Sequence, residues 1–312
     1  MAAKVTLLSG GVGGSKLALG FSKILPPQQF TVIANTGDDF QFLGLHISPD
    51  CDTLIYTLAG LVDPVTGWGV SGDTFHALEV AGSLGAADWF RLGDRDLGLH
   101  LYRTSRLREG MPLSEITRRI AAVMGTNCSV IPMCDKPVPT WIDTDHGDLH
   151  LQEYLVRHGM RPVVNGIRYE NIDQAEPAPG IAESLAGSDL IIAAPSNPFI
   201  SVGPILAVPR MKQLIQEARG LKIGISPIVS GKALKGPLAK MLEQLGHRVS
   251  ATTVARMWAD WLEVFVVDES DAGLRTEIQD LGLRCVVLPT VMTSIEDKKM
   301  LAQQILDMAG SR

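Results

Sequence analysis

The sequence predicts an α/β fold: a Rossmann-like core with a mostly parallel sheet between two helical layers, and an inserted helix-rich subdomain. Short runs of β-branched and apolar residues alternate with longer segments of helical periodicity along most of the chain. A glycine-rich stretch follows the first apolar run, and a group of acidic residues follows the second. The alternation is interrupted between residues 63 and 168, which we interpret as an insertion into a single domain of residues 1–312.

The composition limits the functional classes to which the chain can belong. Its 312 residues are 46% hydrophobic, which is ample for a packed core and argues against disorder. The net charge of -6 is the wrong sign for a nucleic-acid binder. No apolar run is long enough for a membrane anchor, and the four cysteines form no metal-binding pattern. We therefore expect a cytoplasmic protein with reduced thiols and small-molecule partners, without nucleic acid or membrane.

The first predicted unit is a strand over residues 4–8, a glycine-rich turn over residues 9–16 and an amphipathic helix over residues 17–25. Free N–H groups and the helix dipole attract anions at such a turn, so it predicts a phosphate or nucleotide site. A tight turn without a ligand is the alternative. The residues of the predicted site are Gly10, Gly11, Gly13 and Gly14.

This glycine-rich turn fits no standard nucleotide-binding fingerprint. Lys16 stands where the dinucleotide motif needs glycine, and Ser15 precedes Lys16 where a P-loop has the opposite order. The second strand, expected over residues 30–34, ends at Asn35 and not at an acid that could bind an NAD ribose. These departures exclude an NAD-dependent oxidoreductase.

Four aspartates follow the second strand, and they are Asp38, Asp39, Asp50 and Asp52. We expect a helix from residue 53 with Asp52 as its N-cap, so the acids lie where open α/β sheets bind ligands. Carboxylates this close repel one another unless a cation lies among them, and their hard oxygens suit Mg²⁺. The cluster therefore predicts a Mg²⁺ site, while turn formation and helix capping are the alternative explanation.

Residues 63–168 are expected to cover one side of the ligand edge of the sheet. A capped amphipathic helix is predicted over residues 114–123, and a hairpin over residues 140–152 with a turn at His146–Gly147. The charged segment 91–96 is either a solvated loop or a substrate clamp built on a guanidinium group. The acids and histidines of the hairpin are expected to face solvent.

Regular alternation resumes after the insertion. Strands are predicted over residues 188–194, 221–225, 262–268 and 284–288, and helices over residues 211–218, 254–260 and 296–308. Loops after these strands carry hydroxyl and amide groups, among them Ser196 and Asn197. Such groups can donate neutral hydrogen bonds to an anionic ligand, or they can cap the helices that follow.

Taken together, the motifs resemble the 2-phospho-L-lactate transferase family, whose members act in the biosynthesis of coenzyme F420. The resemblance extends over almost the whole chain, from Lys4 to about Ile305, and keeps the order of the family motifs. The segments that carry it are SGGVGGSKLALG, NTGDDF, ISPDCDT, RLGDRD, APSNPF and GISPIVSGKALKGP.

The resemblance implies a homodimeric, Mg²⁺-dependent enzyme with a Rossmann-like core. It would transfer a phospholactyl or phosphoenolpyruvyl group from a guanosine-diphosphate-activated donor to the ribityl hydroxyl of the deazaflavin Fo, and release GMP. The sequence does not distinguish lactate, enolpyruvate and glycerate donors, which differ by a few atoms. The alternative is a non-catalytic relative of the same fold that binds a nucleotide sugar and regulates metabolism or cell shape. The paired acid motifs favour the enzyme.

Matching the motifs also assigns residues to roles. The four aspartates would hold the metal, and either Asp50 or Asp52 would accept the proton of the alcohol. The glycine-rich turn with Lys16, together with Ser196 and Asn197, would bind the guanosine diphosphate part of the donor. The residues expected to contact Fo are Asp52, Thr53 and Arg91, with Arg95 as the nearby alternative.

Overall fold

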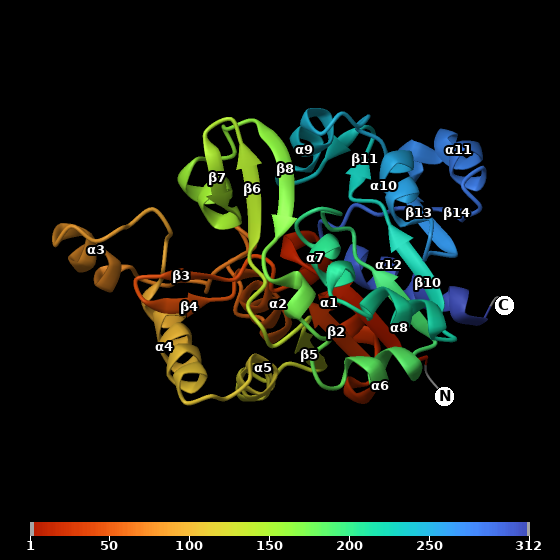
Figure 1. Cartoon of the computed structure of the whole chain (residues 1–312). Coiled ribbons are helices and arrows are strands. Elements are labelled where there is room, and N and C mark those ends of the chain that lie inside the picture. The colour runs from red at the N-terminus through yellow and green to blue at the C-terminus, as the bar shows by residue number, and fades with distance from the viewer. Residues whose placement is uncertain (1–2, 311–312) are drawn as a thin grey trace.

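A seven-stranded parallel sheet forms the centre of the protein, a computed structural model of which describes residues 3–310 (Figure 1). The strand order is β14-β13-β10-β9-β1-β2-β5, and each neighbouring pair is parallel. This confirms the predicted fold class. The strands are β1 (Val5–Ser9), β2 (Phe30–Ala34), β5 (Ser129–Pro132), β9 (Leu190–Ala193), β10 (Leu221–Ile225), β13 (Val264–Asp268) and β14 (Arg284–Leu288).

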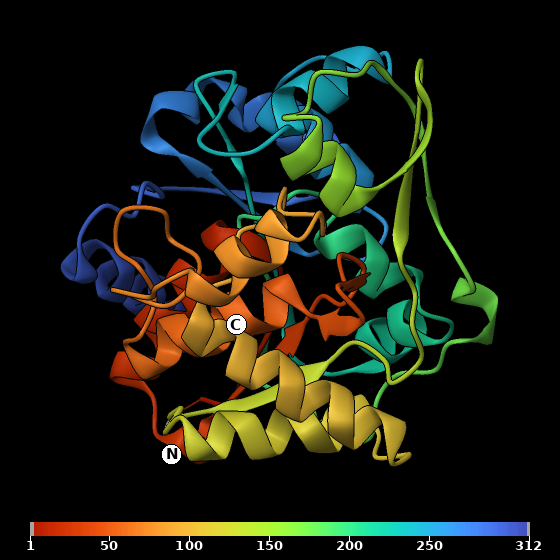
Figure 2. The same cartoon turned by 90° about the vertical axis from the view of Figure 1, so that its left-hand side faces the viewer.

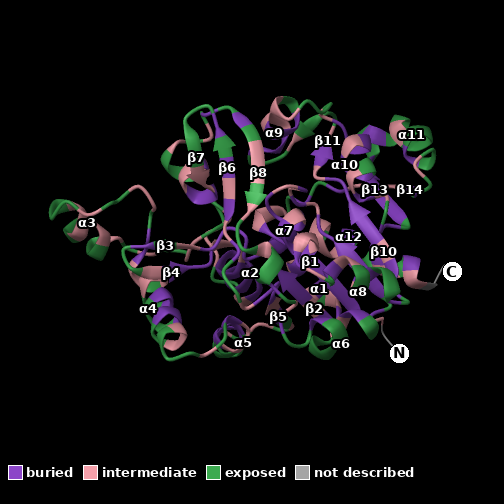
Figure 3. Ribbon diagram, viewed as in Figure 1, coloured by how far each residue is buried: buried purple, intermediate pink, exposed green. Residues whose placement is uncertain are grey.

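Helices cover both faces of the sheet, which produces three layers. Side chains along β1 alternate between two cores: Val5 and Leu7 pack into one, and Leu8 packs into the other. The first core is covered by α1 (Gly11–Ile24), α2 (Pro49–Ala59), α5 (Leu113–Val123) and α12 (Ile295–Asp307). The second is covered by α6 (Ile181–Ala186), α7 (Val202–Ala207), α8 (Met211–Glu217), α9 (Leu238–Gln244), α10 (Ala251–Trp258) and α11 (Arg275–Gln279). Purple, buried residues accordingly follow the central strands in Figure 3.

The order of the strands reverses at β1, because β2 lies on one side of it and β9 on the other. In an open parallel sheet this reversal opens a crevice beyond the carboxyl ends of the strands. The loops that begin at Gly10, Asn35 and Ala194 therefore start beside one another, although they are far apart in the sequence.

The predicted insertion over residues 63–168 is not separate from the core. β5 lies inside this range and pairs with β2 as the edge strand of the central sheet, and α5 packs on the first core. The sequence did not reveal β5, because a strand of four residues with two apolar positions gives little periodic signal. Residues 63–168 instead contain two segments that leave the central sheet. We call the segment before β5 the first excursion and the segment after β5 the second excursion.

The first excursion carries α3 (His76–Ser83) and α4 (Asp94–Arg108), next to the hairpin of β3 (Phe40–Phe42) and β4 (Leu45–Ile47). These elements project from the body of the molecule in Figure 1 and face the viewer in Figure 2. The second excursion is an antiparallel sheet of β6 (Thr140–Thr144), β7 (Gly147–His150) and β8 (Val164–Tyr169), which confirms the predicted hairpin. A small hairpin of β11 (Ile228–Val229) and β12 (Lys232–Ala233) follows β10.

Two predicted element boundaries are wrong near the ligand edge. α2 begins at Pro49 with Ser48 as its N-cap, so Asp52 lies inside the helix and is not the N-cap. The fixed φ of proline suits the first position of a helix. The glycine-rich stretch is mostly helix, because α1 already begins at Gly11. Its glycines permit close packing: a Cβ at Gly13 would lie 2.5 Å from the carbonyl oxygen of Pro195.

The remaining predicted strands and helices occur within a few residues of their expected bounds. Within residues 3–310, the helices are all too short or too polar to cross a membrane.

Gly20 of α1 generates a stability prediction. A Cβ at this position would lie 2.2 Å from the carbonyl oxygen of Lys298 in α12, so Gly20→Ala must push the two helices apart. We expect the free energy of unfolding to fall by about 1–3 kcal/mol in chemical denaturation. Gly98→Ala in α4 is the control, since beyond its chain neighbours and the backbone of its own helix no atom lies within 4 Å of its Cβ position. Equal stability of Gly20→Ala and the wild type would contradict the tight contact.

Candidate active site

A cavity of about 880 Å³ opens at the carboxyl ends of the central strands. It receives side chains from the start of α1, the first turn of α2, the first excursion and the loops after β9, β10 and β14. Its size suits a ligand of cofactor dimensions. The structure brings eleven of the sequence-predicted site residues to it: Gly10, Gly11, Gly13, Lys16, Asp38, Asp50, Asp52, Thr53, Arg91, Ser196 and Asn197.

Three predicted site residues do not line this cavity. Gly14 packs beneath it, where a Cβ would lie 2.2 Å from the hydroxyl of Ser9. Arg95 is exposed. Asp39 is buried away from the cavity and has partners of its own, the imidazole of His46 and the hydroxyl of Ser48.

Asp50 lies against the amino end of α1. One carboxylate oxygen accepts the backbone N–H of Gly11 at 2.7 Å, and the other accepts the side-chain amide of Asn35 at 2.8 Å. Burial raises the pKa of Asp50 to about 6, and these two hydrogen bonds oppose the rise. The first N–H of α1 is therefore taken by a side chain, so the glycine-rich stretch presents fewer free N–H groups than the sequence suggested.

Asp38 is the least satisfied of the four aspartates. Its Oδ2 accepts the side-chain amide of Gln152 at 3.2 Å, while its Oδ1 is buried without a hydrogen-bond partner among the described residues. Burial, followed by the neighbouring charges of Asp50 and Asp39, raises the pKa of Asp38 well above its usual range, and the nearby backbone N–H groups of Asp38 itself and of Asp50 oppose the rise. A buried carboxylate oxygen without a partner is costly. A cation at this position would satisfy it.

Asp52 is paired with a buried arginine. Both terminal nitrogens of Arg103 donate to its carboxylate, Nη1 to Oδ2 at 2.9 Å and Nη2 to Oδ1. Burial raises the pKa of Asp52, and the guanidinium of Arg103 and the nearby imidazole of His100 lower it. Asp52, like Asp39, is thus compensated by groups of the protein itself.

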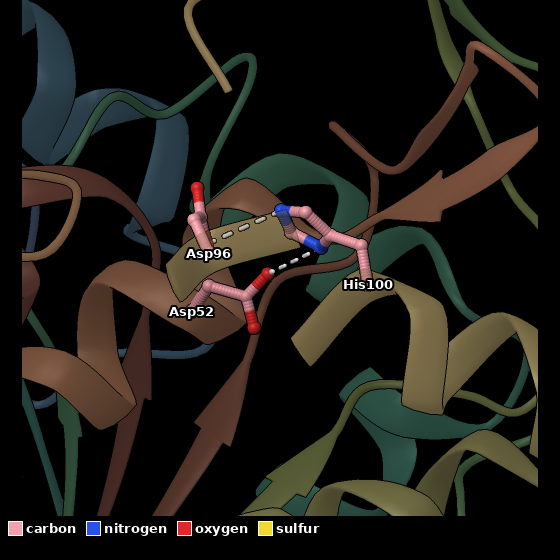
Figure 4. A group of neighbouring side chains, drawn as sticks. All are labelled: Asp52, Asp96 and His100. Carbon is pink, nitrogen blue, oxygen red and sulfur yellow. Dashed lines mark ion pairs between the residues drawn. The ribbon is translucent and has the colours of Figure 1, made fainter. Parts of the chain in front are cut away.

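The imidazole of His100 lies between the carboxylates of Asp52 on α2 and Asp96 on α4, as Figure 4 shows. Its Nδ1 lies 3.7 Å from Asp52 Oδ2, and its Nε2 lies 3.2 Å from Asp96 Oδ1. The hydroxyl of Tyr56 donates to the same Asp96 oxygen at 2.6 Å. One ligand atom each of Asp52, Asp96 and His100 lies within 4.8 Å of the others, a spacing that could also hold a metal ion.

Four residues of this group were not predicted from the sequence: Tyr56, Asp96, His100 and Arg103. A signal was present, because Asp96, His100 and Arg103 follow a helical spacing of four and three residues and must share one face of α4. Nothing in the sequence indicated that this face would meet α2. The contact depends on how the first excursion folds back onto the core.

Aromatic side chains and lysines complete the lining of the cavity. Trp89 and Phe90 contribute rings, and both pack on Phe42 in a small aromatic cluster. The guanidinium of Arg91 stacks on the ring of Phe75 at 4.2 Å. The ammonium of Lys16 donates to the carbonyl of Met292 at 3.1 Å. Burial, and then the charge of Lys235, lowers the pKa of Lys16.

Comparison with known proteins gives matches over almost the whole chain. The family model described as 2-phospho-L-lactate transferase CofD matches residues 5–284. A phosphoenolpyruvate transferase of Streptomyces griseus is 36% identical over 312 residues, which cover 98% of both chains. A 2-phospho-L-lactate transferase of Methanosarcina acetivorans is 35% identical over 303 residues, or 97% of this chain and 98% of that protein.

A solved structure supports the fold alone. Protein BH3568 from Bacillus halodurans matches with a TM-score of 0.65 and 14% identity, and the match covers 98% of this chain and 100% of that one. The family model and the relatives favour the transferase family over the regulatory alternative. The chain therefore belongs to the 2-phospho-L-lactate transferase CofD family.

Proposed function

We propose that the protein transfers a phospholactyl or phosphoenolpyruvyl group from a guanosine-diphosphate-activated donor to the ribityl hydroxyl of Fo, releasing GMP, in coenzyme F420 biosynthesis. Family membership and the names of the relatives support this reaction. The structural observation that carries it is the pair Asp38 and Asp50 in a large cavity at the amino end of α1: one oxygen of Asp38 has no hydrogen-bond partner among the described residues, and the donors to Asp50 are uncharged N–H groups. A phosphoryl-type transfer needs charge stabilisation and positioning more than covalent help from the protein.

Asp38 and Asp50 would hold the Mg²⁺ ion. Both line the cavity, both have a raised pKa, and Asp38 Oδ1 lacks a partner among the described residues. Oxygen ligands of this kind fit Mg²⁺, which when bound would neutralise charge on the transferred phosphate. Asp39 and Asp52 fall outside this pair, because His46 and Ser48 satisfy the first and Arg103 satisfies the second.

The donor would lie over the start of α1. The N–H groups of Val12 and Gly13 have no partner within the helix and, with the ammonium of Lys16, suit phosphate oxygens. The hydroxyl of Ser196 donates to the carbonyl of Gly10 at 2.8 Å, so it fixes the loop from which α1 begins. Asn197 lines the same cavity, and its side-chain oxygen accepts the backbone N–H groups of Phe199 at 2.8 Å and Ile200 at 3.3 Å, so it fixes the shape of the loop after β9.

The acceptor would lie toward the first excursion. The rings of Trp89 and Phe90 offer flat apolar surfaces that suit a deazaflavin ring. Thr53 and Arg91 supply polar groups beside them. Asp52 would orient the attacking hydroxyl, whose oxygen forms the new P–O bond in line as the bond between the two phosphates of the donor breaks and GMP leaves. The carboxylate of Asp50 or Asp52 would accept the hydroxyl proton.

The activity itself is the first test. Purified protein is incubated with Fo, Mg²⁺ and each of the lactyl, enolpyruvyl and glyceryl donors, and the mass of the acceptor is followed by chromatography. We expect a phosphodiester adduct of Fo and one GMP per adduct, lost with EDTA and restored by added Mg²⁺. Folded protein that forms no adduct with any donor would refute the transferase function.

Asp38 generates a prediction in which stability and activity change in opposite directions. A raised pKa means that the folded state holds the proton more tightly than the unfolded state, so stability falls as pH rises above about 4. Without Mg²⁺ at pH 7, Asp38→Asn should therefore raise Tm by at least about 2 °C. Its turnover should fall on the order of 10²-fold, because the Mg²⁺ pair is broken.

Asp88→Asn is the control for this substitution, since Asp88 is exposed and outside the cavity. Calorimetry at several pH values measures Tm, and the transfer assay measures turnover. A variant at Asp38 that is less stable than the wild type would show that the carboxylate is already satisfied inside the folded protein.

We also propose that the enzyme is a homodimer and acts in the cytoplasm, as the family resemblance implies. α3 buries none of its residues within one chain, and Val80 within it and Leu84 just after it are exposed, so we expect a partner subunit to cover it. Sedimentation should give about twice the chain mass of 33.6 kDa. A single species of one chain mass at micromolar concentration would refute the dimer.

A further inference from the structure

Arg103 is buried where a metal or a substrate group would otherwise be expected. Its side chain is 1% exposed, and it reaches from α4 in the first excursion to Asp52 on α2. Both oxygens of Asp52 accept its hydrogen bonds, and its Nη1 also lies 3.2 Å from His100 Nδ1. A bidentate pair of this kind fixes the plane of the carboxylate as well as its position.

The guanidinium supplies the positive charge that the neighbouring acids need. Asp52, Asp96 and His100 could form a metal site by spacing alone (Figure 4). A divalent ion beside Asp52 would, however, meet the charge of Arg103 at hydrogen-bond distance. The cluster is therefore compensated from within the protein, and this separates Asp52 from the pair Asp38 and Asp50.

α4 is fixed to the core at several points, which gives Arg103 a defined position. Thr104, the next residue, accepts the backbone N–H of His46 in β4 at 2.8 Å through its hydroxyl. Tyr56 of α2 donates to Asp96 at the start of α4. These contacts lie on both sides of Arg103 in the sequence, so they fix the position at which its guanidinium meets α2.

We propose that Arg103 is a positioning residue: it holds the carboxylate of Asp52 toward the acceptor hydroxyl and keeps that carboxylate out of the Mg²⁺ site. The proposal rests on the proposed transferase function, in which Asp52 orients the acceptor. Through Arg103, the first excursion then helps to fix the position of the carboxylate that orients the acceptor hydroxyl.

The test compares Arg103→Met, Arg103→Lys, Asp52→Asn and the double variant Asp52→Asn/Arg103→Met. Arg106→Met is the control, because Arg106 lies one turn further along α4 in a surface pair with Glu109. Turnover, KM for Fo, half-saturating Mg²⁺ and Tm are measured for each protein. Arg103→Met leaves Asp52 buried without its partner and can be unstable, so the double variant, which removes both charges, keeps the comparison valid.

We expect Arg103→Met to lower kcat on the order of 10²-fold, the effect of misplacing a reacting group by about 1 Å. Half-saturating Mg²⁺ should stay within about twofold of the wild type. Arg103→Lys should recover part of the turnover. The double variant should turn over as slowly as Asp52→Asn alone, because Arg103 then has nothing left to position.

Three results would overturn the proposal. Wild-type kcat with a lowered Tm in Arg103→Met would assign a purely structural role to the pair. Losses that multiply in the double variant would show that Arg103 acts independently of Asp52. A tenfold or larger change in half-saturating Mg²⁺ would make Asp52 part of the metal site.

Direct binding of Fo, measured without donor by calorimetry, separates this test from the proposed reaction. If the wild type binds Fo but transfers nothing to it, the proposed function fails. The positioning role is still tested, since Arg103→Met should weaken Fo binding about tenfold while Arg106→Met leaves it unchanged. Equal binding of Fo by Arg103→Met and the wild type would count against the role of Arg103.

Discussion

Four aspartates at the edge of a buried parallel sheet impose the main physical constraint on this structure. Carboxylates in a low-dielectric environment are stable only when positive charge or hydrogen-bond donors compensate them. The protein solves this differently for each acid: Asp52 receives a guanidinium, Asp39 an imidazole and a hydroxyl, and Asp50 two N–H donors. Asp38 keeps one oxygen without a donor among the described residues, and this residual deficit singles out the position for a cation.

The topology of the sheet determines where these groups meet. Because β2 and β9 lie on opposite sides of β1, the segments after all three strands open into one crevice. Close packing then refines the arrangement. A Cβ at Gly10 would lie 2.6 Å from an oxygen of Asp50, so only glycine lets the first loop approach the acid. The glycines near the start of the chain thus serve contacts within the protein as much as contacts with a phosphate.

Local patterns in the sequence predicted the parallel core well, with β2, β10 and β14 at their expected residues. They also brought eleven of the fourteen predicted site residues to the cavity, because loops after parallel strands converge wherever the helices between them pack. They failed where structure depends on distant partners. β5 carries too little apolar signal to be identified as the edge strand of the sheet. The N-cap of α2 was predicted at Asp52, but the helix begins at Pro49 and Ser48 is its N-cap. Helical spacing places Arg103 on one face with Asp96 and His100, but no local pattern shows that this face meets Asp52, which lies 51 positions away on another helix.

The pairing of Arg103 with Asp52 also bears on how such a fold can diversify. Excursions between core strands are often treated as exchangeable modules that a lineage can swap to acquire new substrates. Here the first excursion carries Arg103, whose positive charge compensates Asp52 of the core. The chain then continues from the excursion into β5, the edge strand of the central sheet. If the first excursion were exchanged without a matching change at position 52, the carboxylate of Asp52 would stay buried in the core without a positive partner. The two segments are therefore expected to be inherited and recombined as one unit.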